Sequence, residues 1–63
     1  MIDRKLIEMM YDTAAKSELQ GARSAAAVYR RMLEMPLRSQ MTVRFQEGED
    51  FIVTRRKEGY EVA

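Results

Sequence analysis

The stretch of sequence that decides the fold reads Pro36-Leu37-Arg38-Ser39-Gln40-Met41-Thr42-Val43-Arg44-Phe45-Gln46. Before it, apolar residues recur every three or four positions, which is typical of a helix with one buried face. From Met41 to Gln46 apolar and polar residues alternate strictly, which is typical of a strand with one buried face. Because Pro36 lacks an N–H donor and restricts the residue before it, we expect the helical half to end at Met35. A helical half followed by a strand half predicts an α+β fold.

The helical half contains two apolar series that do not share a face. The first is Ile2, Leu6, Met9 and Met10, and the second is Leu19, Ala22, Ala26, Tyr29 and Leu33. At 100° per residue the second stripe is rotated by roughly 150° from the first. This rotation favours a helical hairpin, about residues 3–15 and 18–35, and one long helix is the alternative.

Both predicted helices have sequence signals for their starts. Asp3 is a residue type that caps helix N-termini, so we expect it to cap the first helix. Ser17 followed by Gln20 has the spacing of a capping box, so we expect the second helix to begin there.

The strand half predicts a three-stranded antiparallel meander at about 40–46, 51–57 and 60–63. Its first turn, 47–50, includes Gly48, which is available for a positive φ. A two-residue turn at Glu58-Gly59 would pair Lys57 with Tyr60, Arg56 with Glu61 and Arg55 with Val62. A three-residue turn is the alternative, and it would move the side chains of the third strand to the other face.

The helical hairpin is expected to pack on this meander. The predicted core is Leu6, Met10, Leu19, Ala22, Ala26, Tyr29, Leu33, Val43, Phe45, Phe51, Val53, Tyr60 and Val62. The predicted outer face of the sheet carries Thr42, Arg44, Gln46, Ile52, Thr54, Arg56 and Glu61.

Length and composition limit what can stabilise the chain. Its 63 residues make one small domain, 1–63, and a chain this short buries only roughly 60% of its unfolded surface. It has no Cys and no His, so disulfides, thiolate sites and histidine-based metal or acid–base chemistry lack their usual residues. Packing and self-association remain as sources of stability. For the oligomeric state, the sequence leaves a monomer and a homodimer equally open.

The net charge of +1 is unevenly distributed. Residues 1–20 have a net charge of −1, residues 21–46 of +4 and residues 47–63 of −2. The basic middle segment owes its charge to arginines, which make bidentate contacts to carboxylates and phosphates.

No signal peptide or membrane segment is expected. The residues after Met1 do not lead into an apolar run, and no stretch approaches the ~20 apolar residues of a membrane span. The absence of Cys fits the cytoplasm. We therefore expect a complete small cytoplasmic gene product that does not associate with membranes.

No catalytic, cofactor-binding or metal-binding residues are predicted. The serines have no His to act as a base, and the acidic turn 47–50 lacks the twelve-residue spacing of a calcium loop. The predicted sites are for a macromolecular partner, since Arg recognises carboxylates and Met adapts to irregular surfaces. These partner-binding residues are Arg30, Arg31, Arg38, Arg44, Arg56, Met9 and Met35.

These features predict a non-enzymatic protein-binding module that acts as a regulator, adaptor or inhibitor of a larger protein. Phages and mobile elements encode many stand-alone proteins of this kind. The alternative is a dimeric nucleic-acid-binding regulator that uses an arginine-rich surface. In either case we expect the binding surface to straddle the junction at Pro36.

Overall fold

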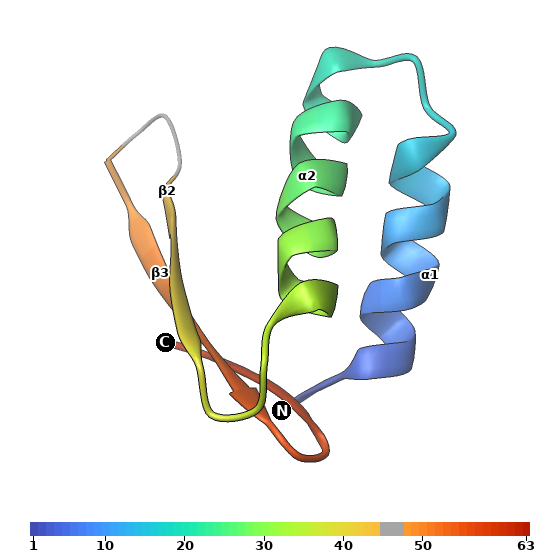
Figure 1. Ribbon diagram of the computed structural model, residues 1–63. Helices are drawn as coiled ribbons and strands as arrows, with labels where there is room; N and C mark the ends of the chain where they lie inside the picture. The colour runs from blue at the N-terminus through green and yellow to red at the C-terminus, as the bar shows by residue number, and fades with distance from the viewer. Residues whose placement is uncertain (45–47) are drawn as a thin grey trace.

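Two helices and a four-stranded antiparallel sheet make up the computed structural model in Figure 1, which describes residues 1–44 and 48–63. The elements follow the chain as β1 (Ile2–Asp3), α1 (Arg4–Ala15), α2 (Gln20–Glu34), β2 (Gln40–Arg44), β3 (Asp50–Arg56) and β4 (Gly59–Val62). The strand order in the sheet is β1-β4-β3-β2. The predicted α+β fold with a helical hairpin is confirmed, and the two-residue strand β1 is an addition to the predicted meander.

The two helices begin by different means. Asp3 caps α1 as predicted, since its carboxylate accepts a hydrogen bond of 3.1 Å from the backbone N–H of Lys5. The capping box predicted for α2 is wrong. Leu19 occupies the N-cap without a side-chain cap, and the Ser17 hydroxyl instead accepts from the N–H of Leu19 at 3.2 Å. Met35 ends α2 in an extended conformation before Pro36, as the restriction imposed by proline requires.

The register between β3 and β4 differs from the prediction by a one-residue shift of the turn. Arg56 lies opposite Gly59, Arg55 opposite Tyr60, Thr54 opposite Glu61 and Val53 opposite Val62. The turn residues are therefore Lys57 and Glu58 rather than Glu58 and Gly59. The shift preserves the side of the sheet to which each residue belongs, because Tyr60 and Val62 still share the face of Val53.

Gly59 is needed for the approach of β1 and not for the turn. It pairs with Asp3, and a Cβ on Gly59 would lie 2.2 Å from the carbonyl oxygen of Ile2. Only glycine allows the two backbones to come so close. Gly48, in the other hairpin, has the predicted positive φ, 82°. Asp50, which was predicted to be in that turn, begins β3. Glu47 and the strand end predicted at Phe45 and Gln46 lie outside the described residues.

The core is smaller than predicted and is centred on different helical residues. Its buried cluster consists of Ile7, Met32, Val43, Val53 and Tyr60, and Ala26 is buried between the helices. Phe51, Ala22, Tyr29 and Leu33 are half-buried rather than fully buried. Leu6, Met10, Leu19 and Val62 were predicted to be core residues and are exposed, by 48%, 37%, 73% and 45%. Predicted core residue Phe45 lies outside the described residues.

The reason for these differences is visible in the arrangement of the two layers. The sheet and α2 lie close together where α2 leads into β2, and they diverge toward the turn between the helices (Figure 1). The sheet therefore covers only one end of the helical hairpin. Leu19, at the other end, has no layer of the described chain over it. Leu6 lies at the covered end, but it points about 100° around α1 from the buried Ile7 and so faces away from the core.

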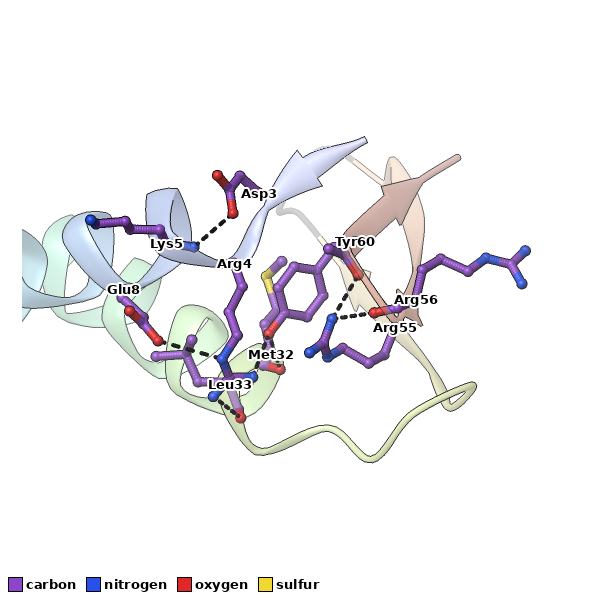
Figure 2. A network of polar contacts seen from close by, with 10 residues as sticks. Asp3, Arg4, Lys5, Glu8, Met32, Leu33, Arg55, Arg56 and Tyr60 are labelled. Atoms are coloured by element: carbon purple, nitrogen blue, oxygen red, sulfur yellow. Dashed lines mark hydrogen bonds and ion pairs between the residues drawn. The ribbon is translucent and has the colours of Figure 1, made fainter.

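The covered end is fixed by polar contacts to the last turn of α2. The buried Tyr60 hydroxyl donates to the carbonyl of Met32 at 2.9 Å, and Arg4 donates to the carbonyl of Leu33 at 3.2 Å and to the Tyr60 hydroxyl at 3.3 Å. Figure 2 shows these groups meeting where α1, α2 and β4 converge. The Met32 carbonyl also accepts from the N–H of Met35 at 3.2 Å, so the Tyr60 hydroxyl is its second donor. The Arg4 charge suits the negative end of the α2 dipole.

Candidate functional site

The chain connecting α2 to β2 forms a tight turn with an unusual backbone conformation. The N–H of Ser39 donates to the carbonyl of Pro36 at 3.2 Å, and the Ser39 hydroxyl donates to the same oxygen at 2.7 Å. Arg38, the third residue of this turn, has φ of 69°, a conformation that favours Gly or Asn. Backbone bonds between Arg38, Ser39 and Arg55 attach the turn to β3. The turn therefore holds Arg38 in a fixed position at a cost in local strain of about 1 kcal/mol.

A depression of about 340 Å³ lies beside this turn, between the end of α2 and the start of β2. It is lined by Arg31, Glu34, Met35, Pro36, Ser39, Gln40 and Met41. Leu37, next to this lining, is 60% exposed. We call the surface made by Arg31 and residues 35–41 the junction surface.

The junction surface carries positive charge that is not neutralised locally. Glu34 pairs with Arg30 at 3.1 Å, and this pair leaves Arg31 without an acidic partner. Among the described residues, neither Arg31 nor Arg38 makes an ion pair, and both are exposed. An exposed leucine, together with two exposed arginines that have no ion pair in the described chain, suits a partner segment that combines acidic and apolar side chains.

The outer face of the sheet holds the other predicted arginines in a different electrostatic state. Arg44 lies 3.9 Å from Asp50, and Arg56 lies 3.3 Å from Glu61. Arg56 and Glu61 were expected to be directly opposite each other and instead interact diagonally, because Glu61 pairs with Thr54. Both outer arginines are therefore paired with carboxylates. Neither is part of the junction surface, and Arg44 lies at the end of β2 away from Pro36.

Arg55 is the least exposed arginine, with 9% of its surface accessible, and it belongs to the scaffold. Its guanidinium lies 4.9 Å from the centre of the Tyr60 ring and donates to the carbonyls of Arg56 and Gly59. These carbonyls and the aromatic face compensate the buried charge. Arg55 thereby holds the turn between β3 and β4.

A second surface lies between the helices, and four of its nine residues, Leu6, Met10, Ala22 and Tyr29, were predicted to be in the core. Six of its residues come from α1 and the turn after it: Leu6, Met9, Met10, Thr13, Ala14 and Ser17. Ala22, Ala25 and Tyr29 of α2 complete it. This interhelical groove has a volume of about 510 Å³, and Met9 at its rim is 61% exposed. Met9 was the one residue of this groove that the sequence predicted to bind a partner.

The seven predicted partner-binding residues thus separate into groups. Arg31 and Met35 line the depression at the junction, Arg38 lies in the turn beside it, and Arg30 precedes Arg31 on α2 in its pair with Glu34. Arg44 and Arg56 lie on the outer face of the sheet, and Met9 lies in the interhelical groove. Leu37 was not predicted, because a single leucine in a turn has no periodicity to reveal its exposure.

The described part of the chain contains no helix long and apolar enough to cross a membrane. No protein-family model matches this sequence, and searches of curated proteins and of solved structures give no significant match.

Proposed function

We propose that this protein is a small non-enzymatic protein-binding module that acts in the cytoplasm as a regulator, adaptor or inhibitor of a larger protein. Its contact surface is the junction surface, and its partner presents carboxylates around an apolar side chain. The observation that carries the proposal is that Arg31, Arg38 and Leu37 are all exposed and that neither arginine has an ion pair in the described chain.

The conformation of Arg38 supports this choice of surface. A glycine would adopt φ of 69° without strain, whereas an arginine there costs about 1 kcal/mol. The side chain returns no ion pair or hydrogen bond to the described chain that would offset this cost. Strained residues of this kind are concentrated at functional sites, because the strained conformation positions the side chain for its target.

Binding would follow from the chemistry of the surface. Arg31 and Arg38 form bidentate hydrogen bonds to carboxylates of the partner, and these strengthen as the interface excludes water. Leu37 and the half-buried Met35 supply apolar contact beside the charges. Positive charge at the rim also raises the rate of encounter with an acidic partner.

A capture experiment with matched variants tests the proposal. The wild-type protein is immobilised and exposed to a nuclease-treated extract of the organism that encodes it, beside the double variant Arg31→Glu/Arg38→Glu. The control is Arg23→Glu/Lys57→Glu, which makes the same charge change at two exposed cations that have no ion pair in the described chain.

We expect one stoichiometric partner protein to be retained by the wild type and by the control and to be lost from the Arg31/Arg38 variant. Retention by that variant would contradict the role of the junction surface. A nucleic-acid function predicts a different outcome, in which purified wild-type protein binds mixed DNA or RNA at low salt and releases it steeply as salt rises.

A further inference from the structure

We propose that the interhelical groove is the interface of a homodimer, in which a second copy of this chain covers the groove by two-fold symmetry. The groove and the junction surface are different parts of the molecule. The proposal therefore goes beyond the function proposed above, and either can fail without the other.

The protomer has more surface than a compact monomer of its size. Folded monomers of 7.4 kDa expose about 4,200 Å² by the usual scaling of area with mass, whereas this chain exposes 5083 Å². The excess of about 900 Å² is close to the roughly 800 Å² that each partner buries in a standard protein interface. Burial of one such interface would reduce the exposed area of the protomer to about that of a compact monomer of the same mass.

The overall dimensions agree with the surface area. The radius of gyration is 11.6 Å, and a compact chain of 63 residues is expected to have about 10.6 Å. The molecule is only 16 Å across its thinnest direction, against 32 Å and 27 Å in the other two. A second copy stacked on a face of this thin molecule would make the assembly compact.

The groove is the uncovered continuation of the hydrophobic core. On α1, Ile7 is 2% exposed, and Met10 on the next turn is already 37% exposed. On α2, Met32 is 4% exposed, whereas Tyr29, one turn nearer the open end, packs on the core with one part and lines the groove with another. The steps of three residues keep these side chains on one face, so the groove faces the direction in which the core is built.

The shape of the groove is complementary to itself. Its α1 side carries the protruding side chains of Leu6 and Met9, which are 48% and 61% exposed. Its α2 side carries the small Ala22 and Ala25, which allow another helix to approach closely. A two-fold rotation places the large residues of each copy against the small residues of the other, as an isologous interface requires.

Charge does not oppose this pairing. Among the described residues that line the groove there is no Asp, Glu, Lys or Arg. The exposed face of α1 beside the groove carries both signs, since Lys16 pairs with Asp12 at 3.0 Å and Arg4 with Glu8 at 3.4 Å. Two identical grooves therefore meet without bringing like charges into the interface.

Sedimentation equilibrium over about 1 μM to 1 mM protein tests the dimer. We expect the wild type to reach twice the 7.4 kDa protomer mass within this range. Met9→Glu is expected to raise the dimer dissociation constant at least about 100-fold, because symmetry places two new carboxylates in one apolar interface. Since Met9 is 61% exposed in the protomer, circular dichroism should show that the variant remains folded.

Leu37→Glu is the matched control, because Leu37 is 60% exposed and lies outside the groove. It should dimerise like the wild type. A wild-type protein that is monomeric throughout would overturn the proposal, and so would assembly beyond a dimer. A dimer that Met9→Glu leaves intact, or that Leu37→Glu disrupts equally, would show that the interface is elsewhere.

Discussion

Replacing Tyr60 by Phe removes a single oxygen atom from the most buried side chain of the protein. Tyr60 has 0% exposure, and its hydroxyl donates to the carbonyl of Met32 and accepts from Arg4. The ring would keep its packing in the Tyr60→Phe variant. The change therefore isolates the contribution of the hydroxyl to the end of α2.

The expected loss follows from the two hydrogen bonds. The Met32 carbonyl keeps its bond from the N–H of Met35, so the variant loses one neutral hydrogen bond, worth about 0.5–1.5 kcal/mol, and the acceptor of one bond from the charged Arg4. We expect the free energy of unfolding to fall by about 2 kcal/mol, out of roughly 3–9 kcal/mol for a chain of 63 residues. With an unfolding entropy of about 0.13 kcal/mol/K for this length, the melting temperature should fall by about 15 °C.

Thermal and urea unfolding followed by circular dichroism at one fixed protein concentration would measure this loss. Tyr29→Phe is the control, because the Tyr29 hydroxyl makes no hydrogen bond with the described chain and its loss should change stability by less than about 0.5 kcal/mol. If Tyr60→Phe were as stable as Tyr29→Phe, the hydroxyl would not secure α2, and the reasoning would be refuted.

Three further predictions concern the backbone and can be measured by the same unfolding assay. Gly59→Ala should lower the free energy of unfolding by about 2 kcal/mol or more, because the new Cβ would meet the Ile2 carbonyl. Gly21→Ala is the control and should be neutral or stabilising, because nothing lies within 4 Å of its Cβ position. Equal effects of the two substitutions on stability would contradict the role of Gly59. Arg38→Gly should stabilise the protein by about 1 kcal/mol and weaken capture of the partner, and stronger capture would argue against the junction surface. Asp3→Ala should cost about 1 kcal/mol while Asp3→Ser costs little, and a loss common to both would mean that capping is not the cause.

The sequence was sufficient for the order and type of most elements. The change of period at Pro36 predicted where helix gives way to strand, and the rotation between the apolar stripes predicted two helices. Strand β1 was missed because two residues are too few to show alternation, and its existence depends on Gly59, which is far away in sequence.

The turn before β4 was misplaced for a related reason. In the sequence, Gly59 was interpreted as a turn residue, which is the commonest role of glycine between strands. In the structure, glycine is required at position 59 because the backbone of β1 leaves no room for a Cβ, and not because the backbone there needs conformational freedom. A single chain segment does not reveal which of these two requirements a glycine meets.

The predictions of the core and of the candidate site were partly wrong for related reasons. Periodicity grouped Leu6 with Met10, whereas the buried residue of α1 is Ile7. Met10 lines a groove because the sheet reaches only one end of the hairpin, and Leu6 lines it because it points about 100° around the helix from Ile7. The prediction of the binding arginines had a similar limitation. Arg44 and Arg56 are paired and Arg31 and Arg38 are not, and this difference depends on neighbours across the sheet and along the helix.

The most direct test of a self-complementary groove with a free junction surface is a dilution series of ¹⁵N-labelled protein followed by amide NMR spectra. We expect the amide signals of Leu6, Met9 and Ala25 to shift with protein concentration while those of Leu37 and Arg38 stay constant. Spectra that do not change with concentration, or shifts centred on the junction surface or the sheet, would contradict the account.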